Sequence, residues 1–338
     1  MKKLLNTLYI TKQDSYIHQE RQTVVIKNGN DKIAQFPLLS LGNIICIGRV
    51  SVSPFLMELC MERNIGIVFY TEYGRFLARV QGRENGNVLL RREQYRWADQ
   101  EKKSTDMAQF FVASKIKNSR ALLQRERRNH GETDSLKKAI DKLSDSIKKV
   151  RNSKSVKEVR GIEGEAANTY FSVFNVLLKE ENFYFKGRIK RPPTDPVNAL
   201  LSFFYSIITQ ECVSALQGVG LDPYVGFLHK DRPGRPSLAL DMLEEFRAAW
   251  ADRFILTLIN RKQIKNRDFY SEASGSIKIK EKARKNILAA YQERKQTNIQ
   301  HSYLNEQVPI GLLPHCQAML LARHIRDDME FYTPFLVK

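Results

Sequence analysis

Short runs of alternating or β-branched residues dominate the first 85 positions of the chain. Such runs predict strands when turn residues separate them. Ser53 followed by Pro54 predicts a helix start, because serine caps helices and proline suits the first helical turn. The expected strands are Leu8–Ile10, Thr23–Lys27, Lys32–Phe36, Asn43–Ile47, Ile65–Thr71 and Arg75–Val80, with Tyr73-Gly74 as a turn. We therefore expect a small, mostly antiparallel β domain that holds one helix, which ends near Arg63.

Helical spacing of apolar residues replaces this pattern after Gly86. The first of these helices are rich in lysine and arginine, whereas those from Val156 onward are more apolar and predict core helices. The expected helices are Asn87–Ala98, Thr105–Arg128, Asp134–Arg151, Val156–Lys179, Pro196–Gly218, Ser237–Gln263, Ile277–Lys295 and Leu312–Arg326. The predicted fold class is therefore α+β, with a small β-sandwich-like N-terminal domain over residues 1–88 and a larger all-α C-terminal domain over residues 89–338.

The chain is strongly basic. Its 338 residues include 55 Lys and Arg against 37 Asp and Glu, which gives a formal net charge of +18. A folded protein with this surplus usually binds a polyanion, and nucleic acid is the leading candidate. A membrane partner is not expected, because the basic residues are spread along the chain instead of forming one amphipathic segment. The alternative is a basic surface with no polyanion partner.

The sequence shows no pattern typical of export or membrane insertion. Asn6 and Lys12–Asp14 interrupt the apolar start. The longest apolar stretch, Ala199–Thr209, is shorter than the roughly 20 residues that cross a bilayer. The cysteines form no C-x-x-C pair, which fits core positions in a reducing compartment. They are Cys46, Cys60, Cys212 and Cys316. We expect a cytoplasmic protein.

A carboxylate interrupts the apolar face of one core helix. Helical spacing aligns Glu163 with Ala167 and Tyr170. Burial of a carboxylate costs several kcal/mol unless a partner neutralises it. Glu163 is therefore either a structural acid paired with an arginine or part of a functional site, and the small residues around it leave room for a ligand. Glu165 belongs to a more polar face and needs no such explanation.

A second acidic group follows a turn-rich basic loop. Ser237 is expected to cap a helix in which Asp241 and Glu244 share one face, and His229 precedes the loop. Acids near a helix start are favourable for the helix dipole, and a lone histidine is usually structural. Two acids and one imidazole that a fold can bring together with Glu163 form an oxygen-rich site suited to Mn²⁺ or Mg²⁺.

Such a site in a basic protein fits a phosphodiester substrate. A divalent ion polarises the phosphoryl oxygen and helps to activate the attacking oxygen. Lysine and arginine side chains around the site would hold the DNA backbone. The candidate DNA-binding residues are Lys186, Arg188, Lys190, Arg191, Arg232, Arg235 and Arg247. Each alone is an ordinary surface charge, so the prediction rests on their grouping near the site.

Three ordered motifs resemble the CRISPR-associated protein one family, the integrases of spacer acquisition. The motifs are Gly161-Ile162-Glu163-Gly164 with Ala166, Ala167 and Tyr170, then Gly226-Phe227-Leu228-His229, then Ser237–Arg247. Pro196–Tyr205 with Asn198, Ser53–Leu56 and Tyr73–Arg75 are similar to the family as well, so the resemblance covers nearly the whole chain. The N-terminal sequence is most similar to the variant found with type I-C systems.

This resemblance implies a site and a reaction. Its metal ligands fall on Glu163, His229 and Glu244, with Asp241 as a further catalytic acid. Some members have Asp at the last position, which leaves the metal preference open. The implied activity is that of a metal-dependent endonuclease and integrase, in which the 3′-hydroxyls of a short DNA duplex attack phosphodiesters at a CRISPR repeat by direct transesterification. The implied partners are DNA, a second copy of the chain and CRISPR-associated protein two.

A non-catalytic basic DNA-binding scaffold also accounts for the charge. In that reading Glu163 and His229 are structural, and the protein shows salt-sensitive DNA binding with no metal-dependent product. A small-molecule metalloenzyme would explain neither the charge nor the lack of nucleotide-binding glycine motifs. A strand-transfer assay with and without EDTA separates the first two readings.

Overall fold

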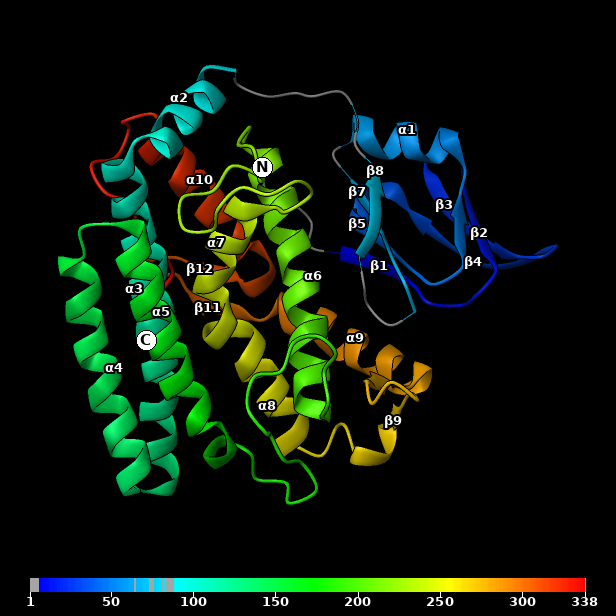
Figure 1. The fold of residues 1–338 in the computed structure, drawn as a ribbon. Helices are drawn as coiled ribbons and strands as arrows, with labels where there is room; N and C mark the ends of the chain where they lie inside the picture. The colour runs from blue at the N-terminus through cyan, green and yellow to red at the C-terminus, as the bar shows by residue number, and fades with distance from the viewer. Residues whose placement is uncertain (1–5, 64, 73–75, 81, 83–87, 338) are drawn as a thin grey trace. The chain divides into compact units, whose positions relative to one another are not determined.

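The computed structural model describes residues 6–63, 65–72, 76–80, 82 and 88–337, and the chain divides into two compact units (Figure 1). The first unit contains Met1–Asn85, Ile279–Asn298 and Pro309–Leu312, and the second contains Gly86–Lys278, Ile299–Val308 and Leu313–Lys338. The expected fold class, a β-rich N-terminal part followed by a mostly helical part, is confirmed. The domain boundary at residue 88 stays a prediction, and the first unit also includes a C-terminal helical segment.

The first unit contains two four-stranded sheets, ordered β1-β5-β7-β8 and β4-β3-β2-β6. The strands are β1 (Asn6–Ile10), β2 (Ser15–Glu20), β3 (Thr23–Asn28), β4 (Asp31–Pro37), β5 (Leu41–Ile47), β6 (Val50–Val52), β7 (Gly66–Tyr70) and β8 (Phe76–Val80). Helix α1 (Pro54–Glu62) begins as predicted, because Ser53 Oγ accepts a hydrogen bond from Leu56 N at 3.2 Å. Helix α9 (Glu281–Gln296) also belongs to this unit.

The prediction of mostly antiparallel pairing is wrong. Strand β5 pairs in parallel with β1 and β7, and β6 pairs in parallel with β2. The chain leaves the first sheet after β1, forms β2, β3 and β4 of the second sheet, and then returns as β5. Turn residues in the sequence indicate hairpins, but they do not show such returns. The expected turn at Tyr73-Gly74 lies outside the described residues.

Strand β2 is not among the expected strands. Its sequence, SYIHQE, contains a single aliphatic residue, so the hydrophobic signal is weak. In the structure Ser15 and Ile17 are buried and Tyr16 between them is exposed, as the two-residue repeat of a strand requires.

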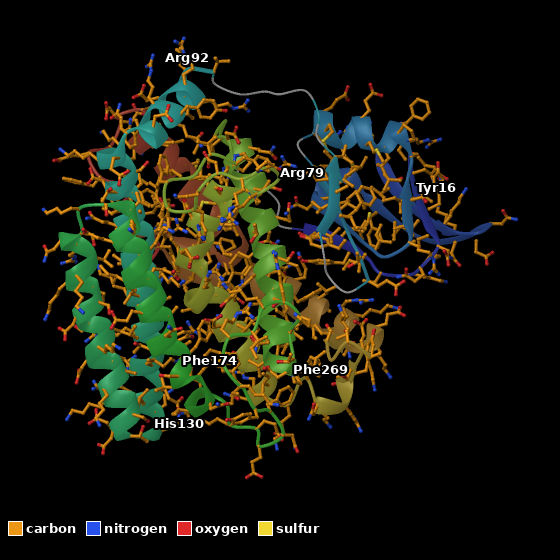
Figure 2. All side chains as sticks on the ribbon, viewed as in Figure 1. Tyr16, Arg79, Arg92, His130, Phe174 and Phe269 are labelled. Atoms are coloured by element: carbon orange, nitrogen blue, oxygen red, sulfur yellow. The ribbon has the colours of Figure 1, made fainter. Side chains whose placement is uncertain are left out.

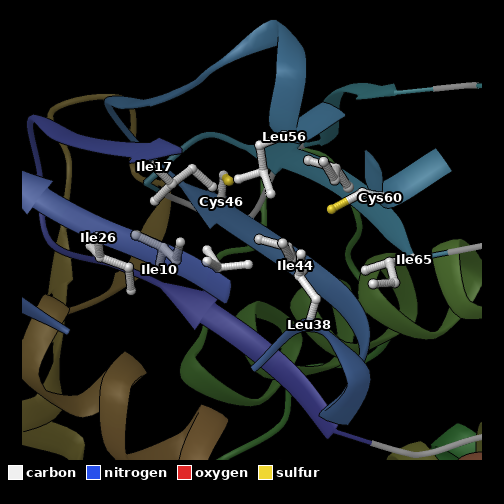
Figure 3. Close-up of a cluster of buried hydrophobic side chains, with 11 residues drawn as sticks. Ile10, Ile17, Ile26, Leu38, Ile44, Cys46, Leu56, Cys60 and Ile65 are labelled. Carbon is white, nitrogen blue, oxygen red and sulfur yellow. The ribbon is translucent and has the colours of Figure 1, made fainter. Parts of the chain in front are cut away.

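One apolar core lies between the two sheets and α1 (Figure 3). Its members include Ile10, Ile17, Val24, Ile44, Cys46, Leu56, Cys60 and Ile67. Burial raises the pKa of the Cys46 and Cys60 thiols to about 12, so neither is a nucleophile at neutral pH. All four cysteines are buried and free, which confirms the prediction of core positions.

Long helices make up most of the second unit. Helices α3, α4 and α5 lie side by side, and α7 packs against both α3 and α6 (Figure 1). The bounds are α2 (Val88–Asp99), α3 (Glu101–His130), α4 (Asp134–Asn152), α5 (Val156–Ser172), α6 (Pro196–Gly218), α7 (Ser237–Phe246), α8 (Arg253–Asn260) and α10 (Leu313–Ile325). The unit is mostly helical, as expected, and two short strand pairs lie largely within it. They are β9 (Phe269–Ser271) with β10 (Ile277–Ile279), and β11 (Asn298–Gln300) with β12 (Gln307–Pro309).

Three expected helices differ from the observed ones. The helix expected over Val156–Lys179 ends at Ser172, and a 3₁₀ helix over Phe174–Leu177 follows (Figure 2 labels Phe174). The helix expected over Ser237–Gln263 is interrupted by a π-helix at Arg247–Asp252. The run expected from Ile277 starts as strand β10 and becomes helical only in α9. Apolar spacing alone does not locate these local changes.

Helix α6 is long and apolar enough to cross a membrane by length and composition. However, 72% of its most apolar window is buried inside the structure. This burial is typical of a core helix and agrees with the prediction for Pro196–Gly218.

Candidate active site

A cavity of about 430 Å³ is lined by residues of α3, α5, α6, α7 and the π-helix. Glu163, His229 and Glu244 all line it. Of the predicted DNA-binding residues, four also line it: Arg188, Lys190, Arg235 and Arg247. The remaining three, Lys186, Arg191 and Arg232, are exposed residues outside the cavity wall. The fold therefore brings together residues that are widely separated in the sequence.

Glu163 lies on the face of α5 that helical spacing predicts. Tyr170 on the same face is buried, and Ala167 lines the cavity. The Glu163 carboxylate pairs with the ammonium of Lys115 on α3. Its side chain keeps 27% of its surface exposed. The partner that the burial argument requires is thus a lysine and not an arginine.

Glu244 of α7 is almost completely buried, with 3% of its side chain exposed. Its Oε2 lies 2.8 Å from Lys115 Nζ and 2.9 Å from Arg247 Nε. Burial alone would raise the pKa of Glu244, but the charges of Arg247 and Lys115 outweigh it and lower the pKa to about 2. The carboxylate is therefore ionised at neutral pH, and two cations neutralise it.

The ammonium of Lys115 contacts both carboxylates. Burial opposes its charge, but Glu244 and Glu163 outweigh this effect and raise the pKa of Lys115. Within the described part of the chain, no three His, Cys, Asp or Glu side chains are grouped closely enough to hold a metal ion directly. The Lys115 ammonium instead bridges the two predicted acidic ligands.

Asp241 fixes the loop that carries His229. The buried carboxylate accepts hydrogen bonds from Phe227 N at 2.7 Å, Leu228 N at 2.9 Å and His229 N at 2.9 Å. Its Oδ1 also lies 2.6 Å from His229 Nδ1. Because a carboxylate oxygen accepts, Nδ1 is the donor of this pair, which leaves Nε2 as the ring atom that can bind a cation. Asp241 therefore orients His229 and is not itself part of the cavity wall.

Close packing of this loop against α7 explains the glycine of the Gly226-Phe227-Leu228-His229 motif. A Cβ at Gly226 would lie 2.9 Å from Asp241 Oδ2 and 2.8 Å from the carbonyl carbon of Ser237. Only glycine fits at such an approach. The prediction that Ser237 caps α7 is wrong. Pro236 occupies the cap position, and Ser237 Oγ donates to Lys230 O at 3.1 Å.

Two neighbouring acids face away from the cavity. Glu165 is exposed, as helical spacing predicts, and it pairs with Lys142 of α4 at 3.1 Å. Glu245 is fully buried and accepts hydrogen bonds from Tyr332 Oη and, at 2.7 Å, from Phe335 N. Glu245 therefore ties the C-terminal segment to α7, and neither acid belongs to the site.

Asn198 of α6 anchors the basic loop that carries Arg188 and Lys190. Its Oδ1 accepts hydrogen bonds from Arg188 Nη1 at 2.7 Å and from Ile189 N at 3.0 Å, and its Nδ2 donates to Gly187 O at 2.7 Å. This buried amide fixes the loop beside the cavity. The loop therefore places the positive charges of Arg188 and Lys190 at the cavity wall.

Arg188 and Arg247 both stack near the ring of Tyr205. Their guanidinium carbons lie 5.4 Å and 4.4 Å from the ring centroid. Cation–π contacts of this kind hold arginine side chains in place. The wall of the cavity is thus both positively charged and fixed in position.

Sequence reasoning did not single out Lys115, Arg160, Tyr205 or Asp252, all of which line the cavity. Lys115 could have been found by the argument used for Glu163. It is four residues from Phe111 and from Ser119, both of which are buried on α3. A lysine on a buried helical face needs a partner just as a glutamate does. Tyr205 and Asp252 carry no comparable signal in the sequence.

Asp252 is buried and accepts hydrogen bonds from Tyr205 Oη at 2.6 Å and Tyr170 Oη at 2.9 Å. Burial raises the pKa of Asp252 to about 6, although both tyrosines and the nearby arginines oppose the shift. A carboxyl whose pKa is higher in the folded state favours folding at low pH, and this contribution is lost as the pH rises through the folded-state pKa.

We expect Asp252→Asn to remove this pH dependence, because asparagine is neutral and can still bond both hydroxyls. Between pH 4 and pH 6 the unchanged protein should lose up to about 3 kcal/mol of its free energy of unfolding, and Asp252→Asn should not. Above pH 6 the difference between the two proteins should stay constant. Urea unfolding of both proteins across this range measures the difference. A constant difference from pH 4 to pH 7 would contradict the prediction.

The types of donor in the cavity suit a hard divalent cation, although in the described arrangement they are not close enough together to bind one directly. Glu163 and Glu244 offer oxygens, and His229 offers one imidazole nitrogen. The Lys115 ammonium demonstrates that one cation can contact both carboxylates. Glu244 Oε2 is buried beside two cations, Lys115 and Arg247, so this oxygen already serves as an anionic partner for positive charge.

The family profile described as "CRISPR associated protein Cas1" matches residues 8–293. This chain belongs to the Cas1 family. It is 48% identical over 341 residues to the CRISPR-associated endonuclease Cas1 1 of Chlorobaculum tepidum, with 99% of each chain covered. The predicted family and the predicted enzyme class, an endonuclease of CRISPR systems, are thereby confirmed.

The fold of this Cas1 chain is similar to that of solved structures. The Cas1 protein TM1797 from Thermotoga maritima has a TM-score of 0.83 at 23% identity, over 98% of this chain and 100% of that one. A chain of the structure titled "Partial Cas6-RT-Cas1--Cas2 complex" has a TM-score of 0.67 at 25% identity, over 98% of this chain and 99% of that one.

Proposed function

We propose that this Cas1 protein is a divalent-metal-dependent DNA integrase and endonuclease of CRISPR spacer acquisition. It joins the 3′-hydroxyl ends of a short DNA duplex to the CRISPR repeat by transesterification. The observation that carries this proposal is the single cavity that Glu163, Glu244 and His229 line together with basic side chains. The endonuclease name of the relative from Chlorobaculum tepidum supports the same class of chemistry.

Glu163, His229 and Glu244 would hold Mn²⁺ or Mg²⁺, which supplies polarisation of the phosphoryl oxygen and activation of the attacking hydroxyl. Asp241 keeps the hydrogen on His229 Nδ1, so that Nε2 keeps its lone pair. We assign Asp241 this positioning role in place of that of a further acid that contacts the substrate.

The basic residues of the cavity wall would bind DNA phosphates. Arg188 and Arg247 are held by Tyr205, and Lys190 and Arg235 line the same cavity. Guanidinium groups suit phosphate oxygens because they donate two parallel hydrogen bonds. The exposed residues Lys186, Arg191 and Arg232 are proposed as outer contacts to the DNA backbone.

We propose DNA, a second copy of the chain and Cas2 as partners. The net charge of +18 supports DNA binding, and the likeness to a chain of a structure titled as a complex with Cas2 supports that assembly. A cytoplasmic location and a type I-C subtype are proposed from the sequence pattern alone.

The deciding experiment is a strand-transfer assay with this protein and Cas2, a labelled duplex with 3′-hydroxyl ends and DNA that contains the repeat. We expect joined product with Mn²⁺ or Mg²⁺ and none with EDTA, because the carboxylates alone would repel the phosphodiester. A duplex with 3′-deoxy ends is the matched control, since it binds equally but lacks the attacking group. DNA binding without joined or cleaved product in either metal would favour the scaffold reading.

A further inference from the structure

We propose that Lys115 is an internal counter-ion that holds the place of the metal between Glu163 and Glu244 and is displaced when the metal binds. The inference rests on the proposed metal site and concerns how that site is kept assembled before loading. Lys115 is then a positioning residue of the unloaded enzyme and a competitor of the metal.

The first argument is geometric. Glu163, Glu244 and Lys115 come from three helices, α5, α7 and α3, and the single ammonium contacts both carboxylates. Without a cation between them, the two like charges would repel each other and the side chains would turn apart. The ammonium therefore keeps both carboxylates directed at one point.

The second argument is that the ammonium and a divalent ion compete for the same oxygens. Glu244 Oε2 is 2.8 Å from Lys115 Nζ, so an ion that ligates this oxygen and Glu163 comes into direct repulsion with the ammonium. Two positive charges already face Glu244, from Lys115 and Arg247. One of these side chains has to retreat when two more positive charges arrive.

The third argument identifies Lys115 as the side chain that moves. Arg247 is held in place, because it stacks on Tyr205 at 4.4 Å and pairs with Glu244 from the next helical turn. The charge of Lys115, by contrast, stands at the end of a flexible four-carbon chain. Its side chain is 13% exposed and lines the cavity, so the ammonium can withdraw into that space.

The test measures Mn²⁺ binding by calorimetry at neutral pH, in the full-length protein without DNA. We expect Lys115→Met to bind Mn²⁺ about tenfold more tightly, because a competing charge has been removed. The same variant should have a lower melting temperature without metal, since the buried Glu244 and the half-buried Glu163 lose their shared partner. A Kd equal to or weaker than that of the unchanged protein would overturn the proposal.

Two variants control for charge and for folding. Lys142→Met removes an exposed lysine–glutamate pair on α4 and α5 outside the cavity, so its Mn²⁺ Kd should stay within about twofold of the unchanged protein. Lys115→Arg keeps the charge and should keep the weaker binding. If Lys115→Met does not fold, Lys115→Gln gives the same comparison, because its amide still bonds a carboxylate without competing as a cation.

The same measurements separate this inference from the proposed function. If Glu163→Gln and Glu244→Gln bind Mn²⁺ as tightly as the unchanged protein, the metal site itself is assigned wrongly. If both variants lose Mn²⁺ while Lys115→Met fails to tighten binding, the metal site stands and the exchange is refuted.

Discussion

Replacement of Glu163 by glutamine should lower metal-dependent cleavage and strand transfer by about 10³-fold, because the loss of a charged ligand removes several kcal/mol of charge stabilisation. Glutamine keeps the size and shape of the side chain, so the helix and the cavity should persist. DNA binding should change little, since the basic wall is untouched. The measurement is single-turnover product formation with Mn²⁺, alongside DNA affinity in a buffer without metal.

Glu165→Gln is the matched control for Glu163→Gln. It makes the same chemical change two residues away on α5, on a side chain that pairs with Lys142 outside the cavity. Its activity should equal that of the unchanged protein. Equal activity of the two variants would mean that the cavity does not hold the reacting groups.

Replacement of Asp241 by asparagine should lower both activity and stability. Asparagine places an N–H₂ group against the backbone donors of residues 227–229, so at least one buried N–H loses its acceptor. We expect a loss of about 2–4 kcal/mol in the free energy of unfolding. Activity should fall about 10–100-fold, because His229 is no longer held in one tautomer and orientation.

Urea unfolding measures the loss of stability in Asp241→Asn. Mn²⁺ affinity and single-turnover activity measure the loss of His229 positioning. Asp231→Asn is the control, because Asp231 is an exposed acid of the same loop whose Oδ1 accepts a long, 3.4 Å hydrogen bond from Gly226 N. Asp241→Asn with unchanged Mn²⁺ affinity and unchanged activity would show that His229 needs no support from this carboxylate.

Lys115 and Glu163 show what a charged residue on an apolar helical face can predict from the sequence. The helical spacing of α5 indicated that Glu163 needed a partner or a role, and the structure provides both a partner and a cavity. The same reasoning applied to α3 would have singled out Lys115. It would not have paired the two residues, because sequence separation carries no information on which helices meet.

Asp241 and Glu245 show what helical spacing cannot predict, which is the partner of a side chain. Both were visible as acids of one helix, and Asp241 was expected to act beside Glu244. The structure places Asp241 behind His229, and it places Glu245 against the C-terminal segment through Tyr332. A helical wheel gives the direction of a side chain, but the neighbour in that direction depends on loops and on distant segments.

The sequence by itself determined the fold class, the alternation of strands and helices, the separate faces of Glu163 and Glu165, and the family, because these depend on local periodicity and on ordered motifs. The tertiary structure decided the parallel strand pairings, the inclusion of α9 in the N-terminal unit and the ammonium shared by two carboxylates. These features depend on contacts between residues far apart in the chain. They are selected by the packing of the whole fold and not by the pattern of any one segment.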